Sequence, residues 1–313
     1  MTNPTRPLGK SGIPVTSIGL GLMSLSGIYG ESSDENGVAV IQHAIDQGIN
    51  FLDSADMYGW GHNETLLSTA LKGRRDKVVL ATKFGQTKGE AGGNGVNGKP
   101  AYVKEACEAS LKRLNLDVID LYYVHRIDPN VPIEDTVGAM KDLCVAGKVR
   151  SIGLCEASPE TIRRAHKVHP LAAIQTEYSL LYREQAEETL KVTRELGISF
   201  VAYAPLGRSM LTGTVKNSSD FSNDRRKDHP RFQPGNLERN QQLVAAILAW
   251  LLAQGEDILA IPGTKQTIRV DENLDALKVT LSNQDLAFLS QAFPAGIAAG
   301  TRYPAGGMKG VFI

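Results

Sequence analysis

The sequence predicts an α/β fold, a single (β/α)8 TIM barrel in which parallel strands form the centre and helices surround them. Two observations carry this prediction. Short apolar or β-branched runs alternate with longer amphipathic stretches eight times along the chain. The strand-like runs are continuously apolar, as expected where helices cover a parallel sheet. The chain has 313 residues, and because barrels of this kind commonly exceed about 250 residues as one unit, we expect a single domain over residues 1–313.

Each expected strand is a short β-branched or apolar run, and each expected helix is the amphipathic stretch that follows it. A doubly wound open sheet would use the same alternation. The closed barrel is favoured because no Gly-x-Gly-x-x-Gly motif follows the first strand and because closure leaves no edge strands. The strands and their helices are expected at residues 16–21 and 34–47, 50–53 and from Asn63, 78–83 and 101–114, 119–125 and 133–146, 149–155 and 159–168, 173–177 and 184–196, 199–204 and 237–254, and 258–262 and after Arg269.

Two connections are longer than a bare linker needs to be, which is typical of functional or mobile loops on barrels. Residues 86–100 are rich in glycine and are expected to be flexible. The C-terminal tail 297–313, which contains Tyr303, is expected to lie over the mouth of the barrel. Residues 207–236 carry cations that either reach an anion or lie solvated, namely Arg208, Arg225, Arg226, Lys227 and Arg231.

The composition is that of an ordinary globular protein, with 42% hydrophobic residues and 34 basic residues that cancel 34 acidic ones. This neutrality gives no indication of a nucleic-acid partner. No apolar run reaches the ~18 residues of a membrane span, and the N-terminus has no signal-peptide core, so a cytoplasmic location is expected. Three cysteines without close paired spacing, Cys107, Cys144 and Cys155, are expected to be reduced thiols and not metal ligands.

Four side chains that can move or orient a proton lie at or just beyond the ends of successive expected strands: Asp53, Tyr58, Lys83 and His125. Active sites of such barrels lie at the C-terminal ends of the strands. A free phenol titrates near ~10 and is a weak acid at neutral pH, so Lys83 is expected to lower the pKa of Tyr58 while Asp53 holds the ammonium charged. A neutral His125 can donate a hydrogen bond to a carbonyl. Each residue alone has a structural reading, but their common position favours catalysis.

The stretch from Asn50 to Gly59, NFLDSADMYG, together with Asn63 and Glu64, is similar to the signature of the aldo-keto reductases. The resemblance extends over nearly the whole chain. It implies that Asp53, Tyr58, Lys83 and His125 form the family's catalytic tetrad, and that the chain reduces an aldehyde or ketone to an alcohol with NADPH and without a metal. The alternative is a regulatory or redox-sensing subunit of the same fold that binds NADP(H) with little turnover. The resemblance leaves the oligomeric state open.

The cofactor assignment rests on the end of the chain, where a helix start with cations nearby is typical of a phosphate site. A glutamine, Gln266, where many relatives carry a base predicts a weaker preference for NADPH over NADH. At Cys155 and Glu156 the chain departs from the family's usual Ser-Asn pair. An apolar or aromatic carbonyl substrate is indicated by Met23, Ile28, Trp60 and Tyr303. The resemblance implies that NADP(H) is bound by Gln175 and Tyr203 at the nicotinamide, by Pro205, Leu206 and Gly207 at the pyrophosphate, and by Gly263, Thr264, Lys265, Arg269, Glu272 and Asn273 at the adenosine half.

Overall fold

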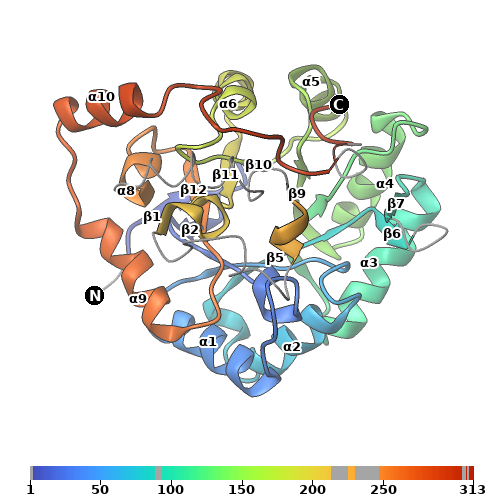
Figure 1. The fold of residues 1–313 in the computed structure, drawn as a ribbon. Helices are drawn as coiled ribbons and strands as arrows, with labels where there is room; N and C mark the ends of the chain where they lie inside the picture. Colours follow the sequence, from blue (N-terminus) through green and yellow to red (C-terminus); the bar gives the residue numbers. More distant parts are fainter. Residues whose placement is uncertain (1–2, 89–93, 213–224, 230–246, 305–307, 309) are drawn as a thin grey trace.

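The computed structural model describes residues 3–88, 94–212, 225–229, 247–304, 308 and 310–313. An eight-stranded parallel sheet has the order β12-β11-β10-β9-β8-β5-β4-β3, and helices surround it (Figure 1). Bridges between Ile18 and Ala260 and between Gly21 and Gly263 join its first and last strands. The sheet therefore closes into the expected barrel, and no barrel strand is left with a free edge.

The barrel strands are short and lie close to the expected positions. Their helices lie on the outside of the sheet in chain order (Figure 1). The strands are β3 Leu20–Gly21, β4 Phe51–Asp53, β5 Val79–Phe84, β8 Ile119–Val124, β9 Val149–Cys155, β10 Ala173–Glu177, β11 Ser199–Tyr203 and β12 Ile258–Ile261. The helices are α1 Asp34–Asp46, α2 His62–Ala70, α3 Pro100–Leu114, α4 Ile133–Val145, α5 Pro159–Val168, α6 Glu184–Leu196, α8 Ile247–Leu252, α9 Thr267–Asp275 and α10 Asn283–Ala292.

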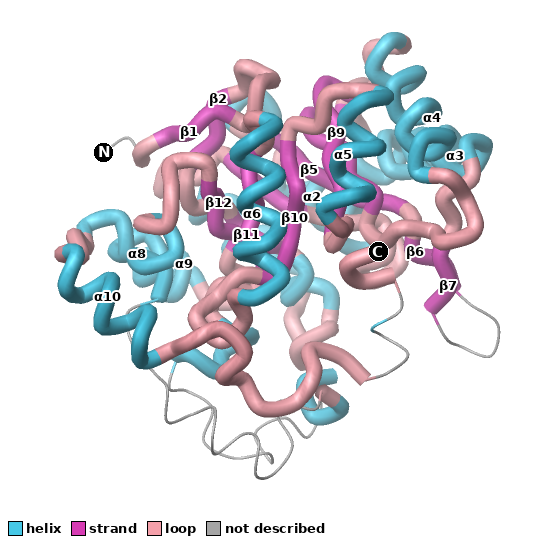
Figure 2. The backbone as a smooth tube through the Cα atoms, turned by 90° about the horizontal axis from the view of Figure 1, so that it is seen from above, coloured by secondary structure: helices cyan, strands magenta, loops and turns pink. Residues whose placement is uncertain are grey.

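An N-terminal hairpin of β1 Thr5–Pro7 and β2 Pro14–Thr16 lies at one end of the barrel (Figure 2). Its Leu8 and Val15 are fully buried and belong to the same apolar cluster as the inward-facing strand residues. The hairpin thus fills the bottom of the barrel with apolar side chains, which leaves the polar side chains at the opposite end, the mouth.

The first strand differs from the expectation. The predicted strand 16–21 is divided, because residues up to Thr16 pair with β1 and only Leu20–Gly21 forms a barrel strand. At Gly19, between them, a Cβ atom would lie 2.7 Å from the backbone oxygen of Phe51, so the chain needs glycine at this close approach.

Other departures concern the connections. The glycine-rich segment expected to be flexible contains a second hairpin, β6 Gln86–Lys88 with β7 Asn94–Val96. Of the single helix expected at 237–254, residues 237–246 lie outside the described residues, and α8 begins at Ile247. Within the described parts of the chain, no helix has both the length and the apolar character required to cross a membrane. The three cysteines are free.

Candidate active site

Strand alternation directs one set of polar side chains into the mouth. On β5, Val79 and Ala81 belong to the apolar cluster inside the barrel, and Lys83 continues the same two-residue period. On β4, Asp53 lies two residues after the inward-facing Phe51, and His125, just beyond β8, lies two residues after the inward-facing Tyr123. The register of the parallel strands brings these positions to the same end, so the interior changes from apolar to polar at its C-terminal layer.

Lys83 is the centre of the cluster. Its side chain is fully buried, and its ammonium donates to a carboxylate oxygen of Asp53 and, at 2.7 Å, to the backbone oxygen of Ser54. The phenolic oxygen of Tyr58 lies 3.2 Å from the same Nζ atom. The second carboxylate oxygen of Asp53 accepts a 2.8 Å hydrogen bond from the amide of Gln175. Each member of the Tyr58–Lys83–Asp53–Gln175 chain thus fixes the next.

Asn63 and Glu64 hold the loop that carries Tyr58. The Asn63 side chain accepts from the Ser54 hydroxyl at 2.7 Å and donates to the backbone oxygen of Leu22 at 2.9 Å. Glu64 is fully buried and accepts from Thr82 on β5. Both therefore position the loop from α2 without reaching the mouth, which explains why the motif extends beyond the tyrosine.

His125 completes the group. Its ring and the ring of Tyr58 meet edge to face, with centroids 5.7 Å apart. Burial and the nearby charges of Lys83 and Arg126 hold the pKa of His125 well below its ordinary value. The imidazole is therefore neutral at pH 7, and one of its nitrogens carries a hydrogen that it can donate.

The protonation of the buried trio differs in one respect from the expectation. Burial raises the pKa of Tyr58 to about 12, and Lys83, which alone would lower it, does not outweigh this. The pKa is therefore raised overall and not lowered as expected, because the phenol is almost fully enclosed. Burial alone would lower the pKa of Lys83, but Asp53, Tyr58 and Cys155 together outweigh it and the pKa is raised. At neutral pH the trio thus holds a protonated phenol beside an ammonium.

The segment expected to bind adenosine joins β12 to α9 at the mouth. Lys265 donates to the backbone oxygens of Tyr29 at 2.7 Å and Glu31 at 3.2 Å, which ties this segment to the loop before α1. On α9, Arg269 and Glu272 are exposed and paired with each other, whereas Asn273 is buried on the same helix. The side chain of Gln266, the residue before α9, forms no capping hydrogen bond with the start of this helix, and such a helix start favours an anion. The Thr264 hydroxyl is used locally, accepting from the backbone of Gln266.

The remaining expected contacts are positioned by β10 and β11. Gln175 is engaged with Asp53, as described above, and is not free in this structure. Tyr203 ends β11, and its hydroxyl lies 2.9 Å from the hydroxyl of Tyr303. Pro205, Leu206 and Gly207 follow, with Gly207 in the left-handed region at φ 58° and its N–H bonded to the backbone oxygen of Ala204.

The C-terminal tail adds a charged group that the sequence did not reveal. Arg302 is buried and forms two hydrogen bonds, of 2.8 and 2.7 Å, with the carboxylate of Glu156 beyond β9. The tail thus lies over the mouth, as expected. Arg208, expected either to reach an anion or to be solvated, is buried and pairs with Glu177 at 3.0 Å. Of the other cations in that connection, Arg226 donates to the backbone oxygen of Arg208, and Arg231 lies outside the described residues.

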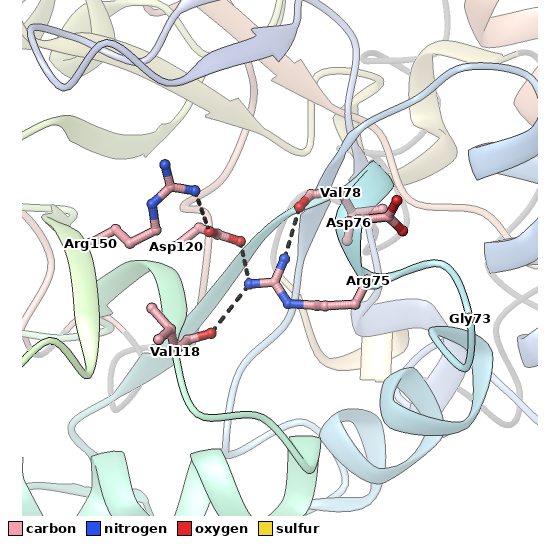
Figure 3. Close-up of a pocket in the computed structure, with 7 residues that line it drawn as sticks. All are labelled: Gly73, Arg75, Asp76, Val78, Val118, Asp120 and Arg150. Atoms are coloured by element: carbon pink, nitrogen blue, oxygen red, sulfur yellow. Dashed lines mark hydrogen bonds and ion pairs between the residues drawn. The ribbon is translucent and has the colours of Figure 1, made fainter.

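A separate hollow of about 700 Å³ lies at the N-terminal ends of β5, β8 and β9 (Figure 3). At its centre the carboxylate of Asp120 accepts from Arg75 at 2.7 Å, from Arg150 at 2.9 Å and from the backbone of Leu80 at 2.8 Å. This carboxylate is satisfied by groups that join three neighbouring strands. The hollow is remote from Lys83, at the end of a barrel where side chains serve stability.

The barrel and the polar layer at its mouth match the general plan of TIM-barrel enzymes, whose active sites lie at the C-terminal ends of the strands. The model of the aldo/keto reductase family matches residues 17–292. The chain is 45% identical to the aldo-keto reductase yakc of Schizosaccharomyces pombe, whose name specifies NADP(+), over 100% of this chain and 98% of that protein. The chain belongs to the aldo/keto reductase family, whose members are oxidoreductases acting on small carbonyl compounds.

Solved structures agree with this assignment. A glycerol dehydrogenase from Gluconobacter oxydans superimposes with a TM-score of 0.83 at 28% identity and covers 93% of this chain and 95% of its own. An aldo-keto reductase from Klebsiella pneumoniae, solved in complex with NADPH, superimposes with a TM-score of 0.72 at 27% identity and covers 97% of this chain and 99% of its own. The barrel therefore has close counterparts over almost its full length.

Proposed function

We propose that this protein reduces an aldehyde or ketone to the corresponding alcohol with NADPH, and that Tyr58 donates the proton. The support is the 3.2 Å contact between Lys83 Nζ and the phenolic oxygen of Tyr58 within a buried, fully connected group. As the carbonyl oxygen gains negative charge, a nearby ammonium and a phenol that still holds its proton are the groups that stabilise it.

Each residue has a separate role in the proposed reaction. Tyr58 transfers its hydroxyl proton to the carbonyl oxygen. Lys83 stabilises the phenolate that remains, and Asp53 keeps Lys83 charged and oriented. Neutral His125 donates a hydrogen bond that orients the carbonyl. When bound, NADPH supplies the hydride that reaches the carbonyl carbon, so that the carbonyl compound, NADPH and a proton become the alcohol and NADP⁺.

The residues of the mouth fit this cofactor. The start of α9 receives no capping hydrogen bond from the side chain of Gln266 and so suits a phosphate, and the exposed cation Arg269 lies on the first turn of the same helix. Tyr203 presents an aromatic ring at the end of β11, packed against the apolar cluster inside the barrel, for stacking on the nicotinamide. We assign the adenosine half to residues 263–273 and the nicotinamide to the region of Tyr203 and Gln175.

The test is a titration of the protein fluorescence with NADPH and with NADH, followed by carbonyl-dependent NADPH oxidation over a panel of aldehydes. We expect saturable binding of NADPH and turnover of aromatic aldehydes. Saturable binding with negligible turnover across the panel would instead favour a regulatory subunit that uses the same fold.

A further inference from the structure

We propose that Arg126 binds a carboxylate of the substrate, so that the preferred substrates are carbonyl compounds that also carry an acidic group. The inference rests on the proposed function, because it assigns a second contact to the molecule whose carbonyl is reduced. It starts from the charges at the mouth.

Three arginines and two glutamates meet where the tail crosses the mouth. Arg302 pairs with Glu156, and Arg208 pairs with Glu177. The third arginine, Arg126, differs from these two. Among the residues that the structure describes, no carboxylate oxygen lies within 4.0 Å of its guanidinium. The two glutamates are already bonded to other arginines, so among the described residues Arg126 has no carboxylate of its own to pair with.

Arg126 is nevertheless 9% exposed, which is an unusual position for an unmatched charge. Its guanidinium donates to the backbone oxygen of His125 at 2.7 Å and lies 3.5 Å from the hydroxyl of Tyr303. A guanidinium has five N–H donors in a planar fork. Within the described part of the chain most of these donors have no acceptor, and a planar anion such as a carboxylate matches this fork with two parallel hydrogen bonds.

The position of Arg126 assigns the anion to the substrate and not to the cofactor. Arg126 directly follows His125, and its charge contributes to lowering the pKa of that imidazole. Both residues follow β8, next to β5, whereas the segments that fit the cofactor follow β11 and β12 on the other side of the sheet order. An acidic group on Arg126 would therefore leave the carbonyl of the same molecule beside His125 and Tyr58.

The experiment compares isosteric aldehydes. The nitro and carboxylate groups are both planar and similar in size, but only the carboxylate is charged, so 3- and 4-carboxybenzaldehyde are each paired with the nitrobenzaldehyde of the same substitution. The measured quantity is the ratio of kcat/KM for the acid to kcat/KM for its nitro partner. We expect Arg126→Gln to lower this ratio at least about tenfold for one of the two isomers, as the loss of a charged hydrogen-bonded pair implies.

Arg150→Gln is the matched control, because it removes the same charge at the opposite end of the barrel and should leave the ratio within about twofold. An unchanged ratio for both isomers in Arg126→Gln would overturn the proposal.

If the Arg126→Gln variant does not fold, a second experiment compares benzoate and benzamide as inhibitors of the unaltered enzyme. With 4-nitrobenzaldehyde as the substrate, the proposal predicts that benzoate inhibits at least about tenfold more strongly than benzamide. Equal inhibition by the two compounds would overturn the proposal. Absence of any aldehyde turnover would contradict the proposed function itself, which is a separate result.

Discussion

Lys83 and Tyr58 meet in the mouth of the barrel, with Nζ and the phenolic oxygen 3.2 Å apart and with no more than 6% of either residue exposed. Burial makes ionisation of the phenol difficult, and the ammonium partly compensates. The proton of Tyr58 is thus retained at neutral pH until a stronger base forms beside it. A carbonyl oxygen that is gaining negative charge is such a base.

The buried pair of Lys83 and Asp53 should be strongly coupled in stability. Lys83→Met leaves the Asp53 carboxylate buried without its cation, and we expect the free energy of unfolding at pH 7 to fall by about 3–5 kcal/mol. The double variant Lys83→Met with Asp53→Asn should be more stable than Lys83→Met alone. Urea denaturation of the single and double variants measures this, and additive losses would show that the two residues do not act as a pair.

Asp56 should make the protein less stable as the pH rises. Burial raises the pKa of Asp56 from 3.8 to about 7, and its Oδ1 atom has no hydrogen-bond partner within the described structure. Between these two values the unfolded chain loses the proton while the folded chain keeps it, so the free energy of unfolding falls with pH and levels off above about 7. Asp56→Asn should therefore gain about 1–3 kcal/mol relative to the unaltered protein between pH 5 and 8. Equal pH dependence of the two proteins in urea denaturation would contradict this.

His125 should behave in the opposite sense. Its pKa in the folded protein lies well below the value of 6.5 that it has when exposed, so its contribution to stability is complete above that value and is lost as the pH falls. We expect His125→Gln to be less sensitive to acid than the unaltered protein below pH ~6. In NMR spectra, the ring signals of His125 should not titrate between pH 8 and 6, and a titration near 6.5 would show that the imidazole is not buried as described.

Arg269 should distinguish the two nicotinamide cofactors. Arg269→Ala removes an exposed cation from the first turn of α9, and we expect the Kd for NADPH to rise about tenfold while the Kd for NADH changes little. Arg163→Ala, which removes an exposed paired arginine from α5, is the control and should affect neither. An equal loss for both cofactors would place the 2′-phosphate elsewhere.

Much of the polar layer could be predicted because it follows from local pattern. The two-residue period of each strand and the motif around Tyr58 were sufficient to bring Asp53, Tyr58, Lys83 and His125 to one end of the barrel. The pKa of Tyr58 could not be predicted in the same way, because its direction depends on how completely the neighbouring chain encloses the phenol.

The contacts of the tail could not be predicted either. Arg302 and Glu156 are 146 residues apart, and no local pattern indicates which acid a cation in the tail will meet. The hydrogen-bond partners of Lys265 could not be predicted for the same reason, since it donates to backbone oxygens more than 230 residues earlier in the chain. Helical and strand periods report which face is buried, whereas pairings of this kind depend on the path of the chain in three dimensions.

The most direct test of the account is the reduction of 4-nitrobenzaldehyde by NADPH in a single turnover with Tyr58→Phe. This change removes one oxygen atom and leaves the ring, Lys83 and Asp53 in place. We expect NADPH to bind with a Kd within about threefold of the unaltered value, while the rate of aldehyde reduction falls by about 10²–10⁴. A rate equal to that of the unaltered protein would show that the phenol of Tyr58 is not the proton donor.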